Sequence, residues 1–118
     1  MKRKPIPKEI RKQVYDMYDG HCAYCGCELE YKDMQVDHID CVYVSELHKE
    51  PVKNTLDNYL PACRQCNFYK STFTIEEFRN RIQTTCLKNL KATFNFKLLK
   101  KYNIIEVNKK PIKFYFEK

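Results

Sequence analysis

Two pairs of cysteines carry the most distinctive chemistry in this sequence. Cys22 and Cys25 form the first Cys-x2-Cys pair, Cys63 and Cys66 form the second, and 37 residues separate the pairs. Four thiolates in two such turns complete a closed tetrahedral shell, which suits Zn²⁺ because this ion imposes no geometric demand of its own. We therefore predict one structural zinc site. The simpler alternative is a set of buried thiols without a ligand.

The remaining cysteines bear on that prediction. The sequence has seven cysteines, and an odd number argues against a framework of disulfides and for thiolate ligands or buried thiols. Cys27 could compete as a ligand, although its spacing fits the pair less well. Cys41 and Cys86 are expected to be thiols of the core. Gly26, directly after the first pair, would let the backbone turn tightly around the sulfur atoms.

A second set of polar residues lies between and just beyond the cysteine pairs. Asp37 can offer a hard oxygen to Mg²⁺ or a similar ion, and Asn67 can offer a carboxamide oxygen. His38, as an imidazole with an ordinary pKa of about 6.5, can take a proton from water near neutral pH. Asn58 can form hydrogen bonds within its loop, and Lys70, one helical turn after Asn67, could contact a phosphate. Each residue alone also has an ordinary surface explanation, but a shared zinc ion would bring all of them together.

The elements in the first half of the chain follow from the hydrophobic pattern. Apolar residues at helical spacing, with Pro7 at the start and Gly20 at the end, predict a helix over 7–19. A cysteine turn should follow, and then a hairpin whose second arm covers 34–39. We expect a long surface loop over 40–57, in which His48 is an exposed histidine.

The second half of the chain is expected to be mainly helical. A short extended segment at 58–62 leads to a brief helix that starts near 63–67. A capping box and an apolar face predict a helix over 74–90, and a further helix is expected over 94–102. The β-branched and aromatic residues at 111–118 suggest a terminal strand.

The basic charge is concentrated at the two ends of the chain. The formal net charge is +7, with +5 in residues 1–12, +7 in residues 88–118 and −5 in residues 13–87. Such a division suits a chain whose ends hold a polyanion, and the alternative is solvated surface charge. The candidate contacts to nucleic acid in the two ends are Lys2, Arg3, Lys4, Lys100 and Lys101.

Neither a signal peptide nor a membrane span is expected. The basic start has no apolar segment behind it, and no run reaches the roughly 18 apolar residues that a membrane span needs. We therefore expect a cytoplasmic protein with no membrane partner.

The motifs together resemble the HNH endonuclease family. The runs CAYCG, VDHI, DNYLPAC and CNFYK occur in the order of that family, over about residues 20–73. The resemblance implies an α+β fold with a small zinc-stapled ββα-metal core of the treble-clef kind. The core would cover 21–73, within a single domain over 1–118. A basic arm and helix over 1–20 would precede it, and a helical and strand extension over 74–118 would follow.

The resemblance also implies roles for the polar residues. His38 corresponds to the general base, and Asn58 to the residue that orients it. Asp37 and Asn67 correspond to the ligands of one divalent ion, which polarises the scissile phosphate and stabilises the leaving oxygen. Because the last motif residue is Asn67 rather than histidine, Mg²⁺ or Mn²⁺ is favoured over zinc or nickel as the catalytic ion.

We therefore expect a metal-dependent endonuclease that hydrolyses phosphodiester bonds in DNA, encoded by a bacterium or a phage. The alternative is a non-catalytic zinc-ribbon module that binds nucleic acid, but such a module has no use for Asp37, His38 and Asn67 together. A secreted toxin nuclease is a third interpretation, and the missing signal segment argues against it. The sequence leaves open whether the chain forms a homodimer or belongs to a larger phage or bacterial machine that acts on nucleic acid.

Overall fold

The computed structural model describes residues 5–40 and 55–118. The chain forms two compact units, one of Met1–Ile75 with Lys113–Lys118 and one of Glu76–Ile112. We expected one domain with an extension from residue 74. The expected loop residues Cys41 and His48 and the basic residues of the N-terminus (Lys2, Arg3 and Lys4) lie outside the described residues.

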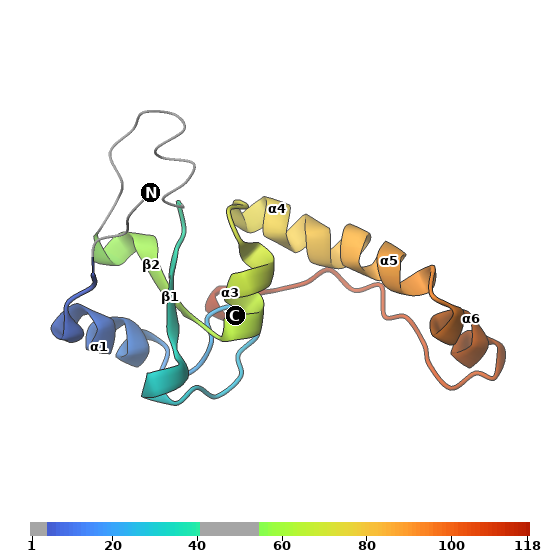
Figure 1. The fold of residues 1–118 in the computed structure, drawn as a ribbon, viewed down its shortest axis with the longest axis horizontal. Coiled ribbons are helices and arrows are strands. Elements are labelled where there is room, and N and C mark those ends of the chain that lie inside the picture. The colour runs from blue at the N-terminus through green and yellow to red at the C-terminus, as the bar shows by residue number, and fades with distance from the viewer. Residues whose placement is uncertain (1–4, 41–54) are drawn as a thin grey trace. The chain divides into compact units, whose positions relative to one another are not determined.

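The first unit begins with helix α1, Lys8–Met17, which confirms the helix predicted over 7–19 (Figure 1). The helix ends because the chain takes positive φ angles at Asp19 and Gly20, where glycine costs least. Val14 is fully buried and forms the centre of the core with Met34 and Tyr59. Helix α1 thus covers one side of the two strands that follow.

Two short strands, β1 (Gln35–His38) and β2 (Tyr59–Ala62), pair antiparallel, with Asp37 opposite Leu60 and His38 opposite Tyr59. The extended segment expected at 58–62 is therefore confirmed as β2. The predicted hairpin is wrong in its pairing, because the partner of β1 is β2 and not the segment before β1. That preceding segment forms a 3-10 turn at Tyr31–Asp33 instead.

Helix α3, Arg64–Lys70, follows β2 and contacts β1. It confirms the brief helix that was expected to start near 63–67. Cys63 caps the helix, because its sulfur accepts a hydrogen bond from the Cys66 backbone N–H at 3.4 Å. Strands β1 and β2 with helix α3 form the ββα arrangement expected for the core (Figure 1).

The second unit is mainly helical. Its helices are α4 (Ile75–Asn80), α5 (Leu87–Lys91) and α6 (Phe94–Lys101), with a π-helical turn at Arg81–Cys86 between the first two. They confirm the helices predicted over 74–90 and 94–102, apart from the π-helical turn. None of the helices in the described part of the chain is long and apolar enough to span a membrane.

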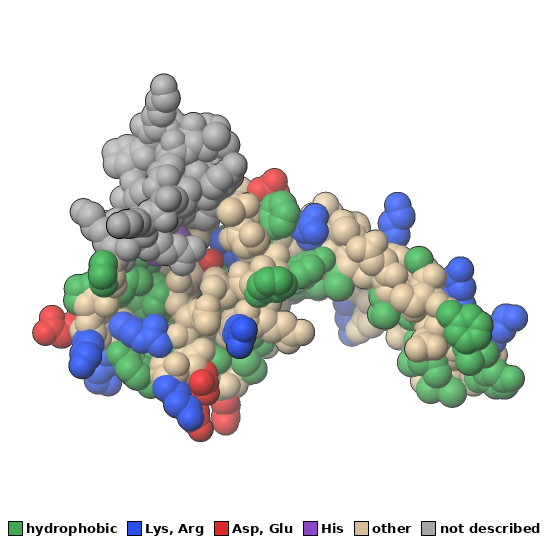
Figure 2. Space-filling model, in the orientation of Figure 1, with side chains coloured by type: hydrophobic (Ala, Val, Ile, Leu, Met, Phe, Trp, Pro, Cys, Tyr) green, Lys and Arg blue, Asp and Glu red, His purple; other side chains and the backbone are tan. Residues whose placement is uncertain are grey.

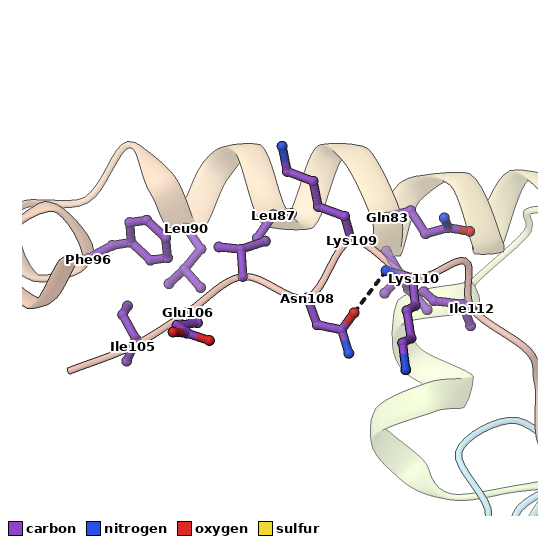
Figure 3. A pocket seen from close by; sticks show the side chains of 12 residues that line it. Gln83, Leu87, Leu90, Phe96, Ile105, Glu106, Asn108, Lys109, Lys110 and Ile112 are labelled. Carbon is purple, nitrogen blue, oxygen red and sulfur yellow. Dashed lines mark hydrogen bonds between the residues drawn. The ribbon is translucent and has the colours of Figure 1, made fainter. Parts of the chain in front are cut away.

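The chain then returns along the helices of the second unit as an extended segment up to Ile112. Between this segment and the helices lies a groove with a volume of about 630 Å³. Leu87, Leu90, Phe96 and Ile105 are among the residues that line it (Figure 3). The groove is therefore the mainly apolar inner side of this unit.

The last residues return to the first unit and pack on its first cysteine turn. The backbone N–H groups of Tyr115 and Phe116 donate to the carbonyl oxygens of Tyr24 and Ala23, at 2.9 and 2.8 Å. The terminal strand predicted over 111–118 is wrong, because the described chain forms a 3-10 turn at Tyr115–Glu117 there. The aromatic residues of this segment pack against Tyr24 rather than extending a sheet.

Candidate metal and catalytic site

The four cysteines of the two pairs lie together, as their spacing predicted. The sulfur atoms of Cys22, Cys25, Cys63 and Cys66 are all within 4.8 Å of one another. A tetrahedron with metal–sulfur bonds of about 2.3 Å has edges of about 3.8 Å, and the sulfur atoms of Cys25 and Cys63 are 3.9 Å apart. The group can therefore hold one metal ion with little rearrangement.

The pKa values of two of these cysteines favour the binding of a metal ion. A hydrogen bond from the Cys66 side chain lowers the pKa of the Cys22 thiol to about 4. The same hydrogen bond, together with burial, raises the pKa of Cys66. The arrangement therefore favours the thiolate form of Cys22, which is the form that binds metal ions.

The other described cysteines lie outside the group. The group of four sulfur atoms does not include Cys27, and desolvation and a hydrogen bond with Cys25 raise the pKa of its thiol to about 12. Cys86 is exposed in the second unit. The expectation that Cys86 is a core thiol is therefore wrong.

Asp37 is the centre of a buried group of polar side chains. It is 5% exposed and lies on β1, where its carboxylate accepts a hydrogen bond of 2.5 Å from the Tyr24 hydroxyl. Its Oδ2 atom is 3.1 Å from Nζ of Lys70, on helix α3. A buried carboxylate needs such partners, because an uncompensated charge in the interior is strongly unfavourable.

Lys70 does not lie where we expected it. The sequence suggested a lysine that contacts a phosphate, but the side chain is fully buried. Its ammonium pairs with Asp37 and donates to the His38 backbone oxygen at 3.2 Å. A lysine in this position stabilises the end of β1 from within, and this arrangement corrects its assignment as a nucleic-acid contact.

Tyr24 is a member of the site that the sequence analysis missed. It is 2% exposed, and burial and then the charge of Asp37 raise the pKa of its hydroxyl. The hydroxyl therefore stays protonated and donates to the carboxylate. Its position between Cys22 and Cys25 could have indicated this role. A metal ion bound by the two cysteine pairs would hold the Cys22–Cys25 turn, and with it the Tyr24 side chain, close to the residues around the second pair.

His38 is the last residue of β1 and is also buried. Its ring meets the ring of Tyr59, its partner across the two strands, edge to face at a centroid distance of 5.0 Å. Neighbouring residues of a strand point to opposite faces, so His38 and Asp37 have different neighbours. That both side chains serve one cleft stays a prediction.

Asn58 holds the chain directly after His38. Its side-chain oxygen accepts from the Asp40 backbone N–H at 2.8 Å, and its side-chain nitrogen donates to the Asp40 carbonyl at 3.2 Å. Its own carbonyl accepts from the Ile39 N–H at 2.9 Å. These three bonds fix the backbone on which His38 is presented.

Asn67 lies on the face of α3 that meets β1. Its side-chain nitrogen donates to Gln35 Oε1 at 2.9 Å. Gln35 and Asp37 are two residues apart on β1 and therefore share a face, and Lys70 contacts Asp37 one turn after Asn67. Thus Asp37, Asn67 and Lys70 belong to the same contact between β1 and α3, and Gln35 is a second residue that the sequence analysis missed.

Comparisons with known proteins agree with this architecture. Residues 22–73 match the family described as HNH endonuclease. A curated relative from Bacillus subtilis (strain 168), the SPbeta prophage-derived protein YoqL, carries the name HNH endonuclease and is 35% identical over 69 residues. That match covers 55% of this chain and 29% of the relative.

A solved structure has a similar fold. The Type II-C Cas9 enzyme from Actinomyces naeslundii matches with a TM-score of 0.54 and 24% sequence identity, over 69% of this chain and 9% of the Cas9 chain. This chain therefore corresponds to less than a third of the curated relative and to a small part of the Cas9 enzyme. Residues 22–73 of this chain therefore resemble the HNH endonuclease family both in sequence and in the order of their ββα elements.

Proposed function

We propose that this chain is a metal-dependent endonuclease that hydrolyses phosphodiester bonds in DNA. The observation that supports this most strongly is the match of residues 22–73 to the HNH endonuclease family, because the β1, β2 and α3 segment within that match carries the candidate residues next to the four-cysteine group. A relative whose name also describes an HNH endonuclease supports the same activity. Base contacts are not needed for this chemistry, so we expect low sequence selectivity.

The cysteine group is proposed to hold a structural zinc ion. Four thiolates close the coordination shell, so no open position is left for water or substrate. Its role is to join the turn at Cys22 and Cys25 to the start of α3 at Cys63 and Cys66. Through Tyr24, which lies on the first turn, the same staple supports the carboxylate of Asp37.

Asp37 and Asn67 are proposed to hold a catalytic Mg²⁺ or Mn²⁺ ion. When bound, such an ion polarises the scissile phosphate and stabilises the leaving oxygen. Hard oxygen donors of this kind are the ligands these ions prefer. The hydrogen bond from Asn67 Nδ2 to Gln35 occupies the nitrogen of the carboxamide, and the oxygen is the atom suited to the cation.

Lys70 has a role in this proposal that differs from phosphate contact. Its ammonium supplies the positive charge that Asp37 needs while the carboxylate lacks a divalent ion. A cation that binds Asp37 therefore competes with this ammonium. The second contact of Lys70, with the His38 backbone oxygen, does not depend on the carboxylate and holds the end of β1.

His38 is proposed as the general base that takes a proton from the attacking water. An imidazole is suited to this step near neutral pH, and a positioned base typically contributes about 10²- to 10⁴-fold to the rate. Asn58 positions it through the backbone at Ile39 and Asp40. The aromatic ring of Tyr59 limits the orientations open to the imidazole.

Incubation of the purified protein with supercoiled plasmid tests the proposal. Parallel reactions contain Mg²⁺, Mn²⁺ or EDTA, and the zinc content is measured after the EDTA treatment so that loss of the staple is recognised. We expect nicked or linear DNA with Mg²⁺ or Mn²⁺ and none with EDTA. DNA that is shifted on the gel but intact under every condition would instead indicate the non-catalytic binding module.

A further inference from the structure

The second unit, Glu76–Ile112, carries an excess of positive charge that the candidate catalytic site does not use. Residues 82–112 contain seven lysines and one acidic residue, Glu106. All seven lysines are exposed. None of their ammonium groups forms an ion pair with a residue in the described part of the chain. Such a surface attracts an anionic partner.

Helix α6 adds large apolar side chains to this charge. Phe94 is 76% exposed and Tyr102 is 72% exposed, with Leu98 between them at 41%. These residues follow one another at intervals of four, so they lie on one side of the helix. Phe96 is buried and lines the groove of the unit instead. The side chains of Phe94, Leu98 and Tyr102 therefore do not contribute to the core of the unit.

Two lysines lie beside this apolar row. Lys97 and Lys101 are each three residues after Phe94 and Leu98 and form a neighbouring row on the helix. We call these five residues (Phe94, Lys97, Leu98, Lys101 and Tyr102) the basic-aromatic face. Figure 2 shows hydrophobic and basic side chains next to one another over the end of this unit that α6 forms.

The face is built on a fixed support. The Thr93 hydroxyl oxygen caps α6 by accepting a hydrogen bond from the Phe96 N–H at 3.2 Å. At the other end, Asn103 takes a positive φ of 56°, and the Ile104 N–H donates to the Leu99 carbonyl at 3.0 Å. Both aromatic residues thus project from a helix that is capped at each end.

We propose that the basic-aromatic face binds nucleic acid with unpaired bases, with Phe94 and Tyr102 as stacking platforms and the lysines on the phosphates. Base–aromatic stacking combined with a basic surface is the usual way in which proteins hold single strands. In a duplex the faces of the bases are covered by their neighbours, so the aromatic residues would gain little. The inference rests on the proposed function only in the choice of nucleic acid as the anionic partner.

The dimensions and the charge favour this partner over a second copy of the chain. Phe94 and Tyr102 are eight residues apart, which is about 12 Å along the helix axis. A strand of DNA covers that distance with about three to four nucleotides at the rise of the duplex, and with fewer when stretched. Two copies that met through this face would bring like-charged lysines together, whereas a nucleic acid neutralises them.

Binding measurements on the 118-residue chain test the proposal. The background is His38→Ala without added divalent cation, so that cleavage does not interfere. The probes are a fluorescein-labelled oligothymidylate of about 16 nucleotides and a hairpin duplex with the same number of phosphates. The variants are Phe94→Ala/Tyr102→Ala and Phe94→Leu/Tyr102→Leu, and the second keeps apolar side chains on the helix if the first does not fold.

We expect either double variant to lose about 10-fold or more in affinity for the single strand, with about a 2-fold change or less for the duplex. Unchanged affinity for the single strand would overturn the proposal. An equal loss of affinity for both probes would also overturn it. A third contradicting result would be a wild-type protein that sediments as a dimer and a Phe94→Leu/Tyr102→Leu variant that sediments as a monomer, because the face would then bind a second copy of the chain.

The experiment is separable from the proposed nuclease activity. A protein that cuts no plasmid but shows the expected selective loss would refute the nuclease and retain the binding face. If the protein cuts plasmid but both variants bind the single strand normally, the binding face is refuted and the nuclease is retained.

Discussion

The first unit contains two sets of ligand atoms in very different states. The four sulfur atoms of the cysteine group already lie near the distances that a bound ion requires. In contrast, the Asp37 carboxylate is engaged by Tyr24 and Lys70. Under the proposed function, the first set is a folding element formed around a metal ion. The second set is then a reaction site whose charge is balanced until a cation competes for it.

The largest expected effect comes from removing the cysteine group. The double variant Cys63→Ala/Cys66→Ala should lose the zinc ion and the folded first unit, because structural zinc contributes about 10 kcal/mol or more in related small sites. Circular dichroism and the metal content of the purified protein measure both changes. Cys86→Ala is the matched control, since this exposed thiol lies outside the group. A double variant that contains no metal but keeps the native circular dichroism spectrum would contradict the proposed role of the zinc ion in folding.

A smaller effect is expected from the buried lysine. Lys70→Met leaves the Asp37 charge without its ion-pair partner, which should lower the free energy of unfolding by about 3–5 kcal/mol. Urea unfolding of zinc-loaded protein measures the change. Lys32→Met is the control, because the Lys32 side chain is 76% exposed in its ion pair with Glu30 and should cost at most about 1 kcal/mol. Equal costs for the two variants would contradict the assigned role of Lys70.

The hydroxyl that joins the two sites should matter less. Tyr24→Phe removes one hydrogen bond to a carboxylate and should cost about 1.5–3 kcal/mol of unfolding free energy. The zinc content should stay unchanged, because the cysteines are untouched. Tyr102→Phe removes an exposed hydroxyl and serves as the control. Loss of zinc from Tyr24→Phe would show that the two sites are not separable in this way.

The sequence was most informative where the determinants are local. Metal-ligand spacing predicted the grouping of Cys22, Cys25, Cys63 and Cys66, and helical periodicity predicted α1, α4, α5 and α6. Helical periodicity and the spacing within each Cys-x2-Cys pair depend on residues a few positions apart, and a shared metal ion was the reason to expect the two distant pairs to meet. The ββα core was expected from the resemblance of the motifs to the HNH endonuclease family.

Long-range contacts were less predictable. The pairing of β1 with β2 joins Asp37 to Leu60, and the burial of Lys70 depends on Asp37, 33 residues away. The sequence alone does not distinguish a lysine that pairs with a buried carboxylate from a lysine that is exposed to solvent. The terminal segment has strand-like composition, but Phe114 and Phe116 pack on Tyr24 instead.

The central claim is that His38 performs the chemistry at a site that the metal staple and Asp37 support. The most direct measurement is the cleavage rate of DNA with saturating protein, compared between the wild type and His38→Ala, with DNA affinity and zinc content measured on the same samples. We predict that the variant cleaves at least about 10²-fold more slowly than the wild type, with unchanged affinity and zinc content. A variant that cleaves at the wild-type rate would contradict the account.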